Sequence, residues 1–125
     1  MSNLVDIDTV PPIDVWGDVV RVRRVEGDRI TLALVELAPN AVVPEHQHGA
    51  EQLGMVVTGS IRMTVDGETR ELGPGGTWRI TSDVAHDAVA GSDGAMVIDV
   101  FTPIRSDWDR FEPQEPQAAP WPVRR

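Results

Sequence analysis

Residues 46–59 read His-Gln-His-Gly-Ala-Glu-Gln-Leu-Gly-Met-Val-Val-Thr-Gly and hold two of the three histidines of the 125-residue chain. His46 and His48 stand two positions apart in a strand-like context, and residues i and i+2 of a strand project from the same face. Their imidazoles can therefore converge on one point, as the ligands of a metal ion must. The alternative is a pair of ordinary surface histidines, because a His-x-His pattern by itself is a weak signal.

Three further side chains are candidates for the same point. Gln52 has the same parity as the two histidines, so a continuing strand would aim it the same way. Glu51 has the opposite parity and stays a reserve ligand, because a turn at residues 49–50 would break the register. His86, the third histidine, follows the loop 81–85 at the start of a later predicted strand.

The segments around this stretch have the period of β-strands. Short runs rich in branched residues are separated by turn signals, of which Asp66-Gly67 between two alternating runs is the strongest for a hairpin. No long window has a convincing helical period, so the chain is predicted to be all-β, a sandwich or barrel. The predicted strands cover residues 19–23, 29–37, 52–58, 60–65, 68–72, 77–80, 86–90 and 95–101.

The two ends differ from this body. Residues 1–18 are predicted to form an extended arm and residues 19–105 the barrel. Residues 106–125 are predicted to form a proline-rich tail, since proline cannot donate to a strand ladder. The tail also carries Trp108 and Trp121. We therefore favour a tail packed on the barrel or on a partner subunit, with a mobile tail as the alternative.

Composition and charge narrow the possible partners. The length suits one domain, and 41% apolar residues suffice for one core. Twenty acidic residues against eleven basic ones give a net charge of −9, which argues against nucleic acid and anionic membranes as partners. No apolar run approaches the ~20 residues of a membrane span. The first residues lack the features of a secretory signal, so a cytoplasmic protein is expected.

Several catalytic chemistries are excluded because their residues do not occur. The chain has no cysteine, lysine or tyrosine. Thiolate metal sites, cysteine nucleophiles and Schiff bases are therefore impossible. Histidine, carboxylate, arginine, hydroxyl groups and a metal ion remain.

The histidine spacing resembles the first motif of the cupin family, in which His-x-His is followed by a glutamate and then a glycine. His46, His48, Gln52 and Gly59 occupy these positions, with glutamine in place of glutamate. The second cupin motif is degenerate here and places His86 mainly by position. This resemblance spans roughly residues 28–101.

The resemblance implies a jelly-roll β-barrel with a metal ion inside. The implied ligands are His46, His48, Gln52 and His86, and the cofactor is one divalent transition metal ion: manganese, iron, nickel, copper or zinc. Glutamine in the glutamate position leaves the ligand set without formal charge. A neutral set favours Lewis-acid use of the metal over oxygen activation.

The segment 95–101, Ala-Met-Val-Ile-Asp-Val-Phe, places a carboxylate in the middle of an apolar strand. A buried carboxylate is costly unless it is paired or hydrogen-bonded. Asp99 therefore either holds a structural partner, such as an arginine, or faces a polar cavity.

The spacing Asp99-x-Phe101-x3-Arg105 is similar to the C-terminal signature of the uronate-linearising cupins of pectin and alginate breakdown. The resemblance implies that these residues surround the metal pocket. Asp99 and Arg105 would be catalytic, with Arg105 also binding a substrate carboxylate beside an apolar wall of Phe101 or Trp78. The alternatives are core packing for Trp78 and, for Arg105, a salt bridge to an aspartate of the tail, Asp107 or Asp109.

The sequence therefore predicts a metal-dependent cupin enzyme for a small oxygenated, carboxylate-bearing substrate. Ring opening and tautomerisation of unsaturated uronates is the specific form. A non-haem metal dioxygenase and a non-catalytic module that binds a small ligand or a metal are the alternatives. A homodimer is expected, because strands 52–58 and 95–101 are apolar on both faces.

Overall fold

A computed structural model describes residues 2–119 and 121, so the extreme ends of the predicted arm and tail, residues 1, 120 and 122–125, lie outside the described residues. Within the described part the chain forms β-strands joined by turns, with two short 3₁₀ helices near its ends. The elements are η1 (Ile7–Thr9), β1 (Ile13–Asp14), β2 (Val20–Glu26), β3 (Thr31–Leu37), β4 (Val42–His46), β5 (Glu51–Val65), β6 (Glu68–Leu72), β7 (Thr77–Ile80), β8 (His86–Thr102) and η2 (Ser106–Arg110).

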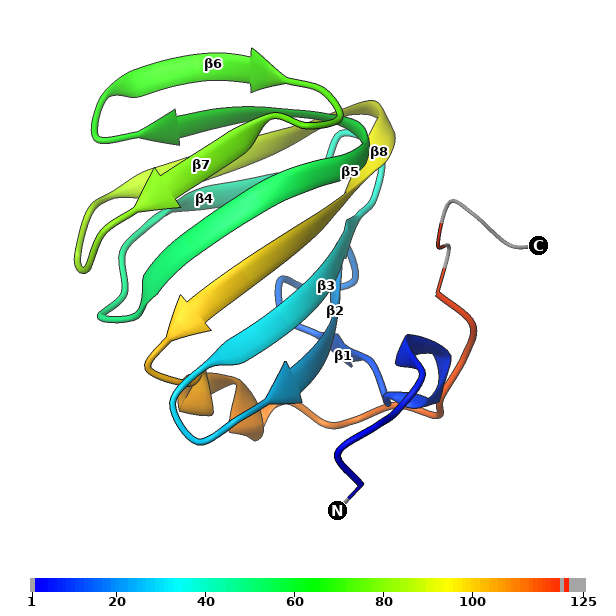
Figure 1. Cartoon of the computed structure of the whole chain (residues 1–125). Coiled ribbons are helices and arrows are strands. Elements are labelled where there is room, and N and C mark those ends of the chain that lie inside the picture. The colour runs from blue at the N-terminus through cyan, green and yellow to red at the C-terminus, as the bar shows by residue number, and fades with distance from the viewer. Residues whose placement is uncertain (1, 120, 122–125) are drawn as a thin grey trace.

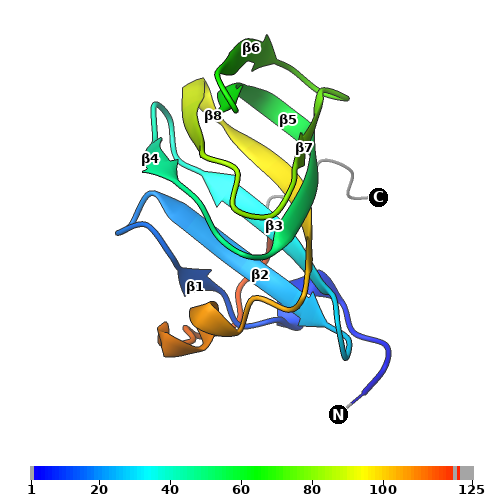
Figure 2. The ribbon, with the colours of Figure 1, turned by 90° about the vertical axis from the view of Figure 1, so that its left-hand side faces the viewer.

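All strand pairs are antiparallel and belong to one sheet. Its order is β1-β2-β3-β8-β5-β6, while β4 pairs with β8 and β7 pairs with β5. The sheet curls on itself without closing, with β6 and β7 at one end and η2 at the other (Figures 1 and 2). The predicted all-β class is confirmed, and an open jelly-roll sandwich is its form.

The prediction of separate strands at 52–58 and 60–65, and at 86–90 and 95–101, was wrong. β5 and β8 are each continuous, and they pair with one another along most of their length. The glycine-containing signals between the predicted pairs mark irregularities in that ladder. Gly59 has a φ of 80°, and a Cβ at this position would collide with the Gly94 carbonyl oxygen.

The predicted hairpin at Asp66-Gly67 is confirmed between β5 and β6. Both residues have positive φ, 49° and 81°. This is the backbone of a two-residue turn whose twist matches that of the flanking strands.

The core lies inside the curl of the sheet. Alternate residues of each strand face inward, and short branched side chains such as Val22, Val56, Val97 and Ile80 are almost fully buried. Toward η2 the core becomes aromatic, where Trp108 packs edge-on against Phe101 at a ring-centroid distance of 5.2 Å. This aromatic end borders the cavity described below.

The described parts of the N-terminal arm and of the C-terminal tail lie against the barrel. β1 extends the sheet through β2. The Gln114 backbone N–H donates to the Pro12 carbonyl oxygen (2.9 Å), and the Gln114 side chain donates to Asp14 (2.7 Å). Of the two interpretations of the tail, the described residues therefore follow the packed one. No helix in the described part of the chain is long and apolar enough to span a membrane.

Candidate metal centre and cavity

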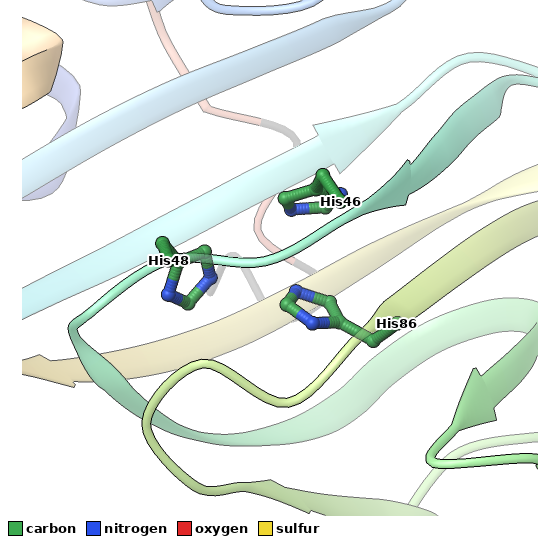
Figure 3. A group of neighbouring side chains, drawn as sticks. All are labelled: His46, His48 and His86. Atoms are coloured by element: carbon green, nitrogen blue, oxygen red, sulfur yellow. The ribbon is translucent and has the colours of Figure 1, made fainter.

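The three histidines lie close together, with His86 across from His46 and His48 (Figure 3). His46 ends β4 and is paired in register with His86, which begins β8, while His48 lies in the connection to β5. The ring of His86 lies 4.2 Å from that of His46 and 4.9 Å from that of His48, measured between centroids. One ring nitrogen from each lies within 4.8 Å of the others. The side chains of His46 and His48 therefore converge on one point, as predicted.

Each imidazole is oriented by a backbone carbonyl oxygen two residues away. The Nδ1 atoms of His46, His48 and His86 lie 2.9, 2.7 and 2.9 Å from such oxygens. Because a carbonyl can only accept, each Nδ1 carries the proton and each Nε2 presents its lone pair. Histidines that ligate metals are held in this way by their second nitrogen.

The charge state of the histidines also suits a metal. The pKa of His86 is lowered to about 4, chiefly by burial and to a lesser extent by the neighbouring His46, His48 and Arg105, against the raising effect of the Val84 carbonyl. Burial likewise lowers the pKa of His48. Both are therefore neutral near pH 7, as ligands must be.

One histidine nitrogen is left without a partner. The Nε2 atom of His48 is buried and has no hydrogen-bond partner among the described residues. A buried acceptor without a partner is costly, so this atom indicates that something else binds there. The site therefore fits a metal ion of the kind that histidine nitrogen and amide oxygen ligate.

Gln52 lies on the inner face of β5, although not for the reason that parity suggested. Strand β4 ends at His46, and the bend at residues 49–50 separates β4 from β5. Pairing with Phe101 in β8 aims Gln52 inward, where it is buried, while Glu51 is exposed on the opposite face.

Asp99 fixes the orientation of the Gln52 side chain. The Gln52 Nε2 atom donates to Asp99 Oδ1 at 2.9 Å. The carboxylate can only accept, so the amide nitrogen of Gln52 faces Asp99. The amide oxygen is then free for the histidine cluster.

Asp99 has an amide and an indole as partners rather than the arginine that we considered. Its Oδ1 atom accepts from Gln52 and also from Trp78 Nε1, at 2.8 Å, while its Oδ2 atom has no partner in the described part of the chain. Burial raises the pKa of Asp99 to about 6, against the lowering effect of both hydrogen bonds and of the Arg105 charge. Asp99 thus presents one anchored and one available oxygen.

Trp78 is part of the core and of the cavity wall at once. It is buried, and its indole N–H reaches Asp99. Gly54 lies between them, in register with both. A Cβ at Gly54 would overlap the Trp78 ring and the Asp99 carboxylate, so only glycine allows this close approach.

Arg105 is buried beside the same cavity and forms the salt bridge considered as its alternative. Its Nε and Nη2 atoms each lie 2.9 Å from one oxygen of Asp107. The Arg105 guanidinium holds the pKa of Asp107 below its usual value. Asp109, the other possible partner, pairs with Arg24 instead, at 2.8 Å.

A cavity of about 270 Å³ joins these groups. This size lies near the lower end of the range for small-molecule sites, roughly 300 Å³ and above. All eight predicted site residues line it: His46, His48, Gln52, Trp78, His86, Asp99, Phe101 and Arg105. The sequence interpretation missed Trp16, which the N-terminal arm places 5.2 Å from His46 between ring centroids. Its only sequence signal is a single tryptophan in the N-terminal arm.

Fold and site together define a cupin, and the chain belongs to the cupin family: the model of the cupin domain matches residues 33–101. The chain is 28% identical over 104 residues to the pectin degradation protein KdgF of Dickeya dadantii (strain 3937). The match covers 82% of this chain and 94% of that protein.

Solved structures agree with this assignment. The structure of KdgF from Halomonas sp. is 30% identical, with a TM-score of 0.70, and the match covers 76% of this chain and 88% of that one. An RmlC-like cupin from Shewanella frigidimarina NCIMB 400 has a TM-score of 0.79 at 23% identity, over 86% of this chain and 96% of that one. The second likeness concerns the fold alone.

Proposed function

We propose that this protein is a metal-dependent cupin enzyme that opens and tautomerises the ring of an unsaturated uronate during pectin degradation. The observation that carries the proposal is one cavity that joins three oriented histidines with Asp99 and Arg105. Similarity to KdgF, a pectin degradation protein, supports the substrate class. The sugars of pectin carry carboxylates, which an arginine fork recognises.

Four side chains would hold the metal ion. They are the three histidines, through Nε2, and Gln52, through its amide oxygen. A divalent transition metal bound by them supplies Lewis-acid polarisation of a substrate oxygen. Manganese, iron, nickel, copper and zinc all accept this donor set.

Asp99 would carry the proton that the isomerisation moves. Opening the ring transfers one proton from the anomeric hydroxyl to the ring oxygen, which leaves an aldehyde and an enol. The enol then loses its hydroxyl proton and gains one at the neighbouring carbon to become a ketone, so no net proton is consumed. Asp99 lines the cavity, and its Oδ2 atom, which has no partner in the described part of the chain, would be available for these transfers.

The site supports this reaction over the two alternatives. A module that only binds a ligand has no need of a buried carboxylate with a free oxygen next to the ligand cluster. A dioxygenase would gain from an anionic ligand in the position of Gln52. Asp99 and Arg105 in one cavity suit a carboxylate-bearing substrate that exchanges protons.

The direct test is turnover of an unsaturated uronate by the metal-loaded protein. NMR should show loss of the ring double bond and growth of the linear keto form, with metal-free protein as the control. If the metal-loaded protein accelerates nothing over that control for several unsaturated uronates, the proposed function is wrong.

Arg105→Ala is expected to weaken substrate binding more than it slows the chemical step. The guanidinium would contact the carboxylate in the ground state and in the transition state alike, so its loss should raise KM by ~10-fold or more with a smaller change in kcat. Steady-state kinetics on the same uronate measure both. An unchanged KM would remove Arg105 from the substrate site.

The outer face of the sheet is expected to form a homodimer, with the terminal arms beside it. Leu32, Val100 and Leu53 are paired neighbours across β3, β8 and β5 on this face. Leu32 is 47% and Leu53 53% exposed, and such an apolar patch favours association. Light scattering at micromolar concentration should give about twice 13.7 kDa.

A charge on this outer face should break the dimer. Leu53→Glu is expected to yield monomers, whereas Val42→Glu, at an equally exposed position on β4, should leave the mass unchanged. A wild-type chain that is already monomeric under these conditions contradicts the prediction.

A further inference from the structure

The two guanidinium nitrogens of Arg105 that could bind a substrate carboxylate, here called the Arg105 fork, are already bonded to Asp107. Both oxygens of Asp107 meet the guanidinium, one at Nε and one at Nη2, each at 2.9 Å. This is the two-point geometry by which a free carboxylate binds an arginine. Arg105 and Asp107 both line the cavity, so the contact lies where a substrate carboxylate would bind.

Contacts other than the one with Asp107 also position Arg105. Its guanidinium carbon lies 4.6 Å from the centre of the Phe101 ring and 4.2 Å from that of Trp108. Its backbone N–H donates to Thr31 Oγ1 at 3.0 Å, and its carbonyl oxygen accepts from Arg24 at 3.0 Å. These contacts would hold the arginine in place if Asp107 released it.

Asp107 is the more exposed partner of the pair. Its side chain is 55% exposed, against 10% for Arg105. In the described part of the chain its carboxylate bonds to Arg105 and, more weakly, to its own backbone N–H. It lies in the short helix η2, at the rim of the cavity. A rotation of this side chain into solvent would free both guanidinium nitrogens.

We infer that Asp107 is an internal competitor for the substrate carboxylate and so a specificity-determining residue. It occupies the Arg105 fork until an anionic ligand displaces it, and an uncharged sugar gains nothing from the exchange. The inference rests on the proposed function in so far as the substrate carries a carboxylate. Its consequence is unusual, because removing a charged residue from the cavity should improve binding.

The test compares Asp107→Asn with the wild type and with a matched control, Asp109→Asn. Asp109 belongs to the same helix, loses the same charge on substitution and pairs with Arg24 rather than Arg105. Calorimetric titration of the full metal-loaded chain would use galacturonate, a saturated sugar acid, and galactose, its uncharged counterpart.

Asparagine keeps the volume of Asp107 but offers the fork only one acceptor and no charge. Galacturonate should therefore bind Asp107→Asn about three- to fivefold more tightly than the wild type, the scale of a partly exposed ion pair. Galactose should bind the wild type and Asp107→Asn with equal affinity. Asp109→Asn should bind each sugar as tightly as the wild type does.

Each other result overturns the inference. Unchanged or weaker galacturonate binding by Asp107→Asn would make Asp107 a support for Arg105 rather than a competitor. An equal gain for galactose, or an equal gain in Asp109→Asn, would show that the effect does not come from the fork. If the wild type binds galacturonate and Asp107→Asn binds it no more tightly, this inference is wrong while the proposed function still stands. Absence of binding by all three proteins defeats the proposed substrate class as well.

Discussion

Replacing His46 and His86 together by alanine is expected to abolish metal binding and to reduce turnover to that of the metal-free protein. The two residues are paired in register where β4 meets β8, and they supply two of the three histidine nitrogens that converge there. Loss of a single outer-shell partner costs a metal site about 10- to 100-fold in affinity, so loss of two ligands should exceed ~100-fold. Elemental analysis and calorimetric titration measure the result.

Gln47→Ala is the matched control, because Gln47 stands between the two histidines of the motif and its side chain is exposed. It should bind metal as the wild type does. Circular dichroism should show the same strand content in all three proteins, since neither His46 nor His86 belongs to the apolar core cluster. Full metal content in the double variant would show that the ion binds elsewhere.

Asp99→Asn should lower turnover by at least ~100-fold, the usual scale for a general acid–base group, while fold and metal content stay intact. The asparagine oxygen can accept from Gln52 and Trp78 as Asp99 Oδ1 does, so the orientation of the Gln52 amide is retained. Only the oxygen that can gain and lose a proton is replaced. The measurement is kcat on the unsaturated uronate beside the metal content of the same sample.

Asp99→Leu separates the two tasks of this carboxylate. Leucine cannot accept from Gln52, so the amide loses its anchor and metal affinity should fall together with turnover. If Asp99→Asn turns over substrate at the wild-type rate, another group carries the proton and the enzyme class still holds. If Asp99→Asn loses its metal, the role of Asp99 is to orient Gln52.

The local sequence pattern was enough to predict the strands, the hairpin and the histidine pair, because these features depend on residues that are close together in the chain. Strand alternation placed most strands, and Asp66-Gly67 placed the β5–β6 hairpin, because a two-residue turn is decided by the φ preferences of its own residues. The two-residue spacing of His46 and His48 predicted their convergence, since parity is a property of one short segment.

Signals that act locally were misleading where a long-range ladder outweighed them. Thr58-Gly59 and residues 91–94 contain turn formers, yet β5 and β8 run through these positions because pairing along both strands compensates for the irregularity. Gln52 shows the same effect in a useful direction. Parity predicted that one strand would run from His46 through Gln52, but that strand ends at His46. Gln52 faces inward because it is paired with Phe101 of β8.

The sequence by itself determined that this chain is all-β, that three histidines and a glutamine are available for a metal, and that Asp99 needs a polar partner. Only the tertiary structure decided which partner, because Asp99 is separated from Gln52 by 47 residues and from Trp78 by 21. It also decided that the arm brings Trp16 to His46 and that Asp107 occupies the Arg105 fork. Parity and turn chemistry act over a few residues, whereas hydrogen-bond partners across a curled sheet are chosen by strand order and register.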